Sequence, residues 1–247
     1  MAKPVRRAAS KSKSTVARAV LEDLAAASRI LVDQGVFDAA GHVSMRHPGN
    51  PKHFLMSRSL APQLVTANDI MEFDLDCVPV DARGRNGFIE RFLHGEIYKK
   101  RPDVMAIAHS HSASVIPFGL TNTPMRAMYH NAAFLAAGVP VFDIREKFGA
   151  CDIVVSTQAK GAALAKVLAD KSVALLRAHG MVAVAESLPV AVFRAIFTEI
   201  SARVQLQAAT LGGPIAALDV EEGRLADIVN IATVGRSWDL WKRRVMK

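Results

Sequence analysis

Glu90 and a histidine pair further along the chain are the residues of this 247-residue sequence that most directly indicate chemistry. The pair is His109 and His111, and it directly follows the apolar run Val104–Ala108. We expect that run to form a buried strand, in which alternate side chains share one face, so that both imidazoles point to the same side. Two adjacent imidazoles and a carboxylate are ligands that divalent metals take from proteins. The spacing therefore indicates a metalloenzyme.

A third histidine, His179, lies in a second apolar run, residues 173–180, which we also expect to form a strand. Two simpler readings compete with a metal site. The paired histidines could be buried strand residues that only form hydrogen bonds, and Glu90 could be a helix N-terminal charge that the helix dipole stabilises. Three histidines together with one carboxylate favour the metal site over both.

A mixture of helices and strands must position these residues. Expected helices cover residues 15–35, 91–101, 127–137, 160–168, 189–211 and most of 219–247. Expected strands cover residues 42–46, 54–56, 70–75, 104–108, 141–144, 153–155, 173–180 and 181–185. The spacing of apolar residues supports these assignments. Because helices and strands do not alternate regularly, the pattern favours an α/β layered fold over a doubly wound parallel sheet.

The formal net charge of +8 is concentrated at the N-terminus. Residues 1–14 hold five basic and no acidic residues, and the remainder carries about +3. We expect residues 1–14 to be a disordered basic tail and residues 15–247 to be a single domain. A nucleic-acid partner bound through the tail would show salt-sensitive binding, but the near-balanced charge of the remainder argues against a nucleic-acid function.

The apolar residues and the cysteines exclude two further classes of protein. No run approaches 18 consecutive apolar residues, so we expect no membrane span. Cys77 and Cys151 form neither a disulfide framework nor a C-x-x-C motif, which is typical of the reducing cytoplasm. We therefore expect a cytoplasmic protein.

The order of several motifs resembles that of the class II aldolase/adducin family, across roughly residues 15 to 215. The matching residues are Gly41-His42-Val43-Ser44, Glu90, Arg101-Pro102-Asp103, His109 with His111, and His179-Gly180. Any one of these motifs is weak, but their combination in this order is specific.

The resemblance implies a central, mostly antiparallel sheet flanked by helices, and a homotetramer with active sites at the subunit boundaries. It also implies one divalent metal ion per subunit, held by His109, His111 and His179. Glu90 is implied either as a further ligand or as an acid/base. Mn²⁺, Zn²⁺ and Fe²⁺ all suit such a site, so the sequence leaves the metal open.

Departures from the sugar-phosphate aldolases of the family indicate a different substrate. His42 replaces an asparagine, Ser57-Arg58-Ser59 replaces a glycine-containing phosphate loop, and Phe88-Ile89 replaces hydroxyl residues before Glu90. A planar guanidinium binds a carboxylate at least as well as a phosphate. The sequence is closer to the decarboxylase-type branch, whose substrates include 3-hydroxy-2-methylpyridine-4,5-dicarboxylate and 3,4-dihydroxyphthalate. We expect Arg58, Ser57, Ser59 and His42 to bind a small-molecule carboxylate substrate.

The leading hypothesis is a metal-dependent decarboxylase of a hydroxylated aromatic or pyridine dicarboxylate, acting through a metal-stabilised enolate. Glu90 or His130, which stands near the position of a tyrosine in the aldolases, would give a proton to the ring carbon. The alternative is an aldolase acting on an unphosphorylated sugar or hydroxy-acid through the same enolate. A non-catalytic adducin-like scaffold is disfavoured because all three metal histidines are present. The role of His94, one helical turn from Glu90, stays open between support of the site and plain packing.

Overall fold

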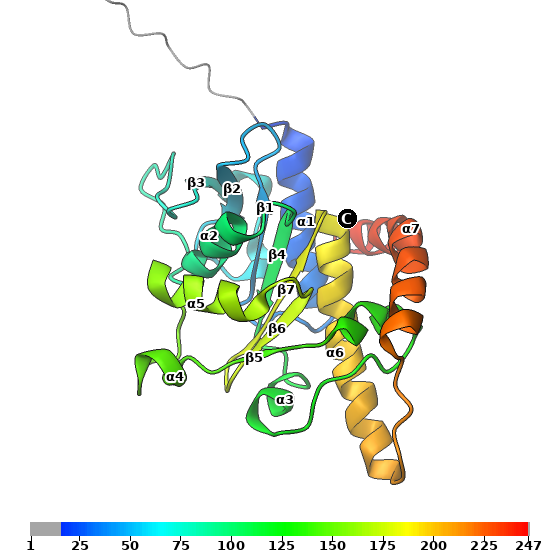
Figure 1. Cartoon of the computed structure of the whole chain (residues 1–247). Coiled ribbons are helices and arrows are strands. Elements are labelled where there is room, and N and C mark those ends of the chain that lie inside the picture. Colours follow the sequence, from blue (N-terminus) through cyan, green and yellow to red (C-terminus); the bar gives the residue numbers. More distant parts are fainter. Residues whose placement is uncertain (1–15, 247) are drawn as a thin grey trace, which may run out of the picture.

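The computed structural model describes residues 16–246, so the expected basic tail over residues 1–14 lies outside the described part. A seven-stranded sheet in the order β3-β2-β1-β4-β7-β6-β5 runs through the molecule (Figure 1). The strands are β1 (His42–Arg46), β2 (His53–Ser57), β3 (Ile70–Asp74), β4 (Ala106–Ser110), β5 (Val141–Phe142), β6 (Val173–Leu176) and β7 (Gly180–Ala185). Every neighbouring pair is antiparallel except β5 and β6. The predicted α/β fold with a mostly antiparallel sheet is confirmed.

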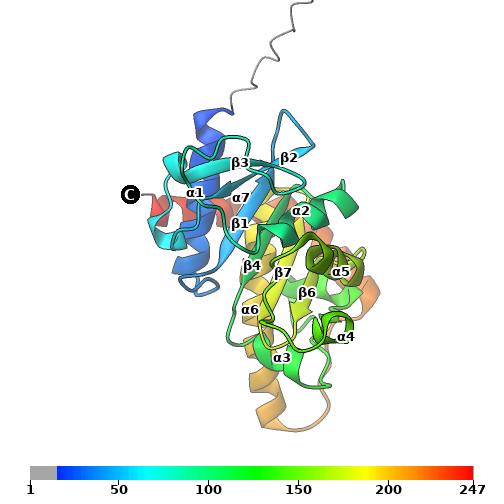
Figure 2. The same ribbon diagram turned by 90° about the vertical axis from the view of Figure 1, so that its left-hand side faces the viewer.

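Helices cover both faces of the sheet, which makes three layers. The α-helices are α1 (Arg18–Asp33), α2 (Arg91–Lys100), α3 (Ile116–Leu120), α4 (Arg145–Phe148), α5 (Gln158–Leu168), α6 (Leu188–Leu211) and α7 (Val220–Val245), and the 3₁₀ helices are η1 (Pro62–Leu64), η2 (Ala67–Asp69) and η3 (His130–Ala137). Figures 1 and 2 show α2 and α5 on one face and α1, α6 and α7 on the other. Within residues 16–246, no helix is both long enough and apolar enough to cross a bilayer.

The alternation of side chains along the strands divides the apolar residues between two cores. Val43 and Ala108 belong to the core beneath α1 and α6, whereas Phe54 and Ile107 belong to the core beneath α2 and α5. His42 and Ser44 alternate with Val43 on β1, so they face α2. The alternation along β1 therefore directs His42 and Ser44 towards α2, the helix that begins after Glu90.

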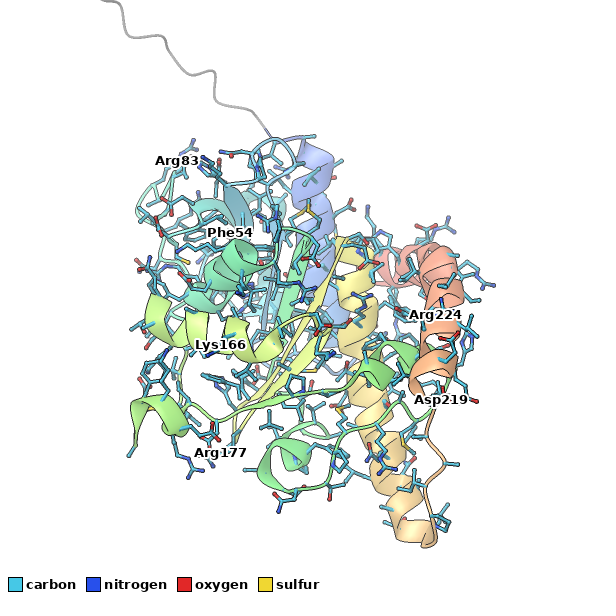
Figure 3. The ribbon with its side chains drawn as sticks, in the orientation of Figure 1. Phe54, Arg83, Lys166, Arg177, Asp219 and Arg224 are labelled. Carbon is cyan, nitrogen blue, oxygen red and sulfur yellow. The ribbon has the colours of Figure 1, made fainter. Side chains whose placement is uncertain are left out.

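The register of the sheet brings the histidines to one end of neighbouring strands. His42 pairs with His109 across β1 and β4, and His109 pairs with Val182 across β4 and β7. His179 lies in the short turn that joins β6 to β7, which also contains Arg177 (Figure 3). Residues as far apart in sequence as His42 and Val182 therefore lie close together in the central strands of the sheet.

The C-terminal helices pack on the opposite face from α2. Asp219 and Glu222 form a capping box at the start of α7, where Figure 3 labels Asp219. Trp238 and Trp241 of α7 are buried, as expected for residues that pack on the body of the protein. Helix α7 also contacts η3, and the side-chain amide of Asn230 donates to the carbonyl of His130.

Several of the expected elements were wrong in detail. The strands expected over 104–108 and 141–144 are β4 (Ala106–Ser110), which includes His109, and the shorter β5 (Val141–Phe142). Residues 153–155 form no strand, because Ile153 has a φ of +54° and the polar backbone groups of this segment bind side chains instead of a neighbouring strand. The strand expected over 173–180 ends at Leu176, and Ala178 adopts a φ of +55° in the turn that follows. The helix expected over 127–137 is the shorter 3₁₀ helix η3.

Candidate metal centre

The structure brings together the four side chains singled out from the sequence. Glu90, His109, His111 and His179 each offer one ligand atom, and these atoms all lie within 4.8 Å of one another. Oε2 of Glu90 lies 3.3 Å from Nε2 of His109 and 3.5 Å from Nε2 of His179. Nε2 of His111 lies 3.1 Å from Nε2 of His179. The three imidazoles therefore turn the same nitrogen towards one point.

Backbone carbonyls accept hydrogen bonds from Nδ1 of two of these rings, on the side away from the centre. Nδ1 of His109 donates to the carbonyl of Met181 at 2.9 Å, and Nδ1 of His179 donates to the carbonyl of Ile153 at 3.0 Å. A carbonyl can only accept, so the hydrogen of each neutral ring is on Nδ1 and the lone pair is on Nε2. This arrangement presents both lone pairs to the centre, as metal-binding histidines do.

Asp38 holds the third ring, and sequence reasoning missed it. Its Oδ2 lies 2.9 Å from Nδ1 of His111, while its Oδ1 accepts from the backbone N–H groups of Ala40 and Gly41. Burial opposes ionisation of Asp38, but these hydrogen bonds outweigh it and hold its pKa below the usual value. The available signal was the turn chemistry of an aspartate shortly before a glycine, which does not reveal that the free oxygen meets His111.

Glu90 is the N-cap residue of α2, yet its side chain does not cap the helix. Oε1 accepts from the backbone N–H of Val155 at 2.9 Å, and Oε2 faces His109 and His179. Burial opposes ionisation, but His109 and His179 outweigh it when they are protonated, and the pKa of Glu90 then lies well below its usual range. The reading of Glu90 as a simple helix-terminal charge is therefore wrong.

The residues present fit a divalent metal ion. Nε2 of His109 is fully buried and has no hydrogen-bond partner among the described residues, and burial lowers the pKa of this ring. With its hydrogen on Nδ1, a neutral His109 sets a lone pair against the carboxylate oxygen of Glu90 at 3.3 Å, which is repulsive without a cation. Three imidazole nitrogens and one carboxylate oxygen are a donor set for Zn²⁺, Mn²⁺ or Fe²⁺.

A segment without regular structure, residues 152–156, supports the centre from outside. It supplies the Val155 N–H to Glu90 and the Ile153 carbonyl to His179. Lys160 of α5 holds this segment, since its Nζ donates to the carbonyl of Val154 and to the carboxylate of Asp152, both at 2.9 Å. A lysine that touches neither ligand thereby determines where both ligands sit.

Replacing Lys160 by methionine is expected to weaken metal binding by about 10-fold, because the loosened segment no longer orients Glu90 and His179. Metal affinity can be measured by titration against a competing chelator. The matched control is Lys166→Met, since Lys166 is an exposed lysine of the same helix. Equal affinities of the two variants would show that Lys160 does not support the centre.

A second layer of polar side chains lies between the centre and α2. Nδ1 of His42 lies 2.8 Å from Nε2 of His94, and Nδ1 of His94 lies 2.7 Å from Oγ of Ser44. Oγ of Ser44 lies 2.8 Å from the hydroxyl of Tyr98. The ring of His42 lies 5.0 Å from that of His109. His94 is thus fully buried and hydrogen-bonded rather than a surface residue, and burial lowers its pKa to about 3.

The serine–arginine segment expected to bind substrate lies at the end of β2. Nε of Arg58 donates to Asp69 at 2.7 Å, and the backbone of Arg58 bridges to Gly87. Ser57 is buried in the strand and Ser59 is exposed. Among the described residues, no hydrogen bond joins these three side chains to Glu90 or to the histidines, so their role in binding stays a prediction.

His130 lies at the start of η3 and is exposed. Its Nδ1 lies 3.3 Å from the amide oxygen of Asn131, and its carbonyl accepts from Asn230. It is not among the residues that gather around Glu90. Its expected acid/base role stays a prediction.

Comparison with known proteins gives matches over most of the chain. The profile of the Class II Aldolase and Adducin N-terminal domain matches residues 22–206. The decarboxylase tropJ of Talaromyces stipitatus is 37% identical over 239 residues, which cover 87% of this chain and 90% of the relative. A 3,4-dihydroxyphthalate decarboxylase of Arthrobacter keyseri is 27% identical over 241 residues, 92% of each chain. A solved aldolase II superfamily protein from Pseudomonas syringae is similar with a TM-score of 0.76 at 23% identity, over 92% of both chains.

The relatives agree with both the fold and the motifs. The solved structure has the same layered fold, and the two relatives named decarboxylases confirm the resemblance to the decarboxylase-type branch. Because the family profile covers the strands, helices and turns that hold Glu90 and the three histidines, the protein belongs to the class II aldolase and adducin family, within which it is a carbon–carbon lyase of the carboxy-lyase type.

Proposed function

We propose that the protein is a metal-dependent decarboxylase of a hydroxylated aromatic or pyridine dicarboxylate. The observation that carries the proposal is the centre itself, in which three imidazole nitrogens and Glu90 converge. Nδ1 of each ring is hydrogen-bonded to a backbone carbonyl or to Asp38. The ligands would be His109, His111 and His179, with Glu90 as a further ligand or an acid. The similarity to decarboxylases, one of them named for 3,4-dihydroxyphthalate, supports the substrate class.

The proposed reaction removes a carboxylate that is ortho to a ring hydroxyl. The bound metal supplies Lewis-acid stabilisation of the negative charge that develops on the hydroxyl oxygen. A proton adds to the ring carbon that bears the carboxylate, the bond to the carboxylate breaks, carbon dioxide leaves, and the electron pair restores the aromatic ring. We assign this proton transfer to Oε2 of Glu90, which faces the centre: the ionised carboxylate takes the proton of the ring hydroxyl and gives it to the ring carbon. His130 is the alternative donor.

Arg58 is proposed to bind the second carboxylate of the substrate, with Ser57 and Ser59 nearby. Its guanidinium is paired with Asp69 through Nε. No hydrogen bond from its two terminal nitrogens to a described residue is found, and its side chain is 39% exposed. Two parallel N–H donors are the geometry that binds a carboxylate in a bidentate manner.

We further propose a cytoplasmic homotetramer. Helix α7 exposes six large apolar residues, which are Val220, Leu225, Ile228, Val229, Ile231 and Leu240. Exposed apolar groups along one helix are typical of a surface that meets another protein. His130 lies beside this helix, so an assembled neighbour could receive its side chain at a subunit boundary.

The proposed function is tested by carbon dioxide release from a panel of hydroxylated aromatic and pyridine dicarboxylates. Release should stop after chelation and return when Mn²⁺, Zn²⁺ or Fe²⁺ is restored, each tested separately. Phthalate, which has no ring hydroxyl, is the matched unreactive compound. If no compound of the panel released carbon dioxide although metal was bound, the result would favour the alternative, aldol chemistry on an unphosphorylated sugar or hydroxy-acid.

A further inference from the structure

The buried chain from Tyr98 to His42 determines which nitrogen of His42 carries a hydrogen. The chain runs from the Tyr98 hydroxyl through Ser44 and His94 to Nδ1 of His42, with separations of 2.8, 2.7 and 2.8 Å. All four side chains are almost completely buried. A hydroxyl hydrogen of Ser44 or Tyr98 that finds no acceptor is therefore left unpaired away from water, which is unfavourable.

Counting hydrogens leaves one arrangement in which the only donor without a partner is at the end of the chain nearest the centre, Nε2–H of His42. Tyr98 donates to Ser44, Ser44 donates to Nδ1 of His94, and Nε2–H of His94 donates to Nδ1 of His42. If the rings instead donated in the opposite direction, Nδ1–H of His94 would take the Ser44 oxygen as its acceptor. Then either the Ser44 or the Tyr98 hydroxyl hydrogen would have no acceptor in the chain. The favoured arrangement places the hydrogen of His42 on Nε2.

Nε2 of His42 has no hydrogen-bond partner among the described residues, and its ring lies 5.0 Å from the ring of His109 and 4.7 Å from that of Phe88. It is not one of the fully buried unpartnered atoms of the described residues, so its hydrogen can meet water or a ligand, which an unpaired hydroxyl hydrogen inside the chain cannot. A nitrogen that carries a hydrogen has no lone pair for a metal. His42 therefore stands next to the metal ligands as a donor and not as one of them. Its position at the end of β1, paired with His109, places that donor beside the centre.

We propose that Nε2–H of His42 donates a hydrogen bond to an anionic oxygen of the bound substrate, and that Ser44 and His94 are positioning residues that fix its tautomer. This inference rests on the proposed function, since it names the part of the site that recognises an oxyanion. The chain is not a route for protons to water, because it ends at the buried Tyr98 hydroxyl, whose pKa is raised by burial. It orients His42 and leaves proton transfer to another group.

The first test uses substitutions of His42 and measures binding and metal content separately. His42→Leu removes the donor, and His42→Gln restores an N–H at a similar distance from the backbone. With 3,4-dihydroxybenzoate as an unreactive probe, we expect His42→Leu to weaken binding about 10-fold and His42→Gln to recover most of it. Both variants should keep the metal content of the wild type. Loss of metal from His42→Leu, with the fold retained in thermal melts, would overturn the proposal and make His42 a ligand.

The second test removes the tautomer bias without touching His42. Ser44→Ala deletes the hydroxyl that accepts from Tyr98 and donates to His94, whereas Tyr98→Phe leaves Ser44 able to donate to His94. We expect Ser44→Ala to raise KM for 3,4-dihydroxyphthalate several-fold with a smaller change in kcat, and Tyr98→Phe to change KM little. Equal effects of the two substitutions on KM would contradict the hydrogen count.

Nuclear magnetic resonance of ¹⁵N-histidine-labelled protein reads the tautomer directly and needs no turnover. The resonances of His42 are assigned by their absence from His42→Leu. We expect the Nε2–H tautomer in the wild type and a mixture in Ser44→Ala. A wild-type Nδ1–H tautomer would overturn the inference. Failure of the proposed function would instead appear as an inactive wild type with the Nε2–H tautomer intact.

Discussion

Glu90→Gln is expected to lower kcat/KM by at least about 100-fold while the metal stays bound. The amide oxygen can still accept from the backbone N–H of Val155, so the side chain keeps its place. The amide cannot give a proton to a ring carbon, which is the role that we assign to Oε2. His109, His111 and His179 remain as three nitrogen ligands, which suffice for a catalytic site. Turnover and metal content should be measured on the same preparation.

The matched control is Glu96→Gln, because Glu96 lies on the same helix but pairs with Lys99 and takes no part in the centre. We expect this control to keep full activity, since the amide oxygen of glutamine can still accept from Nζ of Lys99 and the centre is untouched. Loss of metal from Glu90→Gln together with activity would contradict the proton-donor role and make Glu90 an essential ligand. Full activity with metal bound would remove Glu90 from the chemistry.

Gly180→Ala should lower the stability of the protein and abolish activity together. A Cβ atom at Gly180 would come within 1.9 Å of the carbonyl oxygen of Ser110 and 3.0 Å of the Cα of His111. Strands β4 and β7 cannot keep their register with such an overlap, so they must move apart at the point that holds His111 and His179. We expect a loss of about 3 kcal/mol or more in the free energy of unfolding. For a protein of this size that lowers the melting temperature by roughly 6–12 °C.

Gly235→Ala is the control for this prediction, because a Cβ built at Gly235 of α7 meets nothing within 4 Å apart from its chain neighbours and the backbone of its own helix. Alanine favours a helix over glycine by about 0.5–1 kcal/mol, so the control should melt at the same or a higher temperature. Calorimetry of the two variants measures the difference. If Gly180→Ala melted with the wild type, the close approach of β4 and β7 would not be a constraint.

The central ligands could be predicted because local rules specify them. The alternation of side chains in a strand places His109 and His111 on one side, and the sheet then adds His179. His109 and His111 are close in sequence, so the strand period alone pairs them, whereas the resemblance to the class II aldolase/adducin family was needed to join His179 and Glu90 to them.

The supporting residues could not be predicted because they act across long separations. Asp38 meets His111 73 residues later, and Ser44 meets His94 50 residues later. Nothing in the local sequence distinguishes these residues from an ordinary turn aspartate or strand serine. Tertiary contacts decide their roles, so a single sequence names the ligands but not the groups that orient them.

The wrong strand over residues 153–155 has a physical cause in the same contacts. Its apolar, β-branched residues are typical of a strand, but the N–H of Val155 binds Glu90 and the carbonyl of Ile153 binds His179. Those backbone groups are then unavailable to a neighbouring strand. Ile153 adopts a φ of +54°, which β-branched residues rarely do and which functional sites often contain.

The hydrogen bonds from side chains of the centre to distant backbone groups also bear on the order in which the protein folds. The bond from His109 to Met181 spans 72 residues, and the bond from Glu90 to Val155 spans 65. Such distant contacts form late, because the entropy of closing a long loop must be overcome before they stabilise the chain. A refolding chain should therefore take up its metal only after β4 and β7 have paired. Metal binding would then be among the last steps of folding and would not initiate folding.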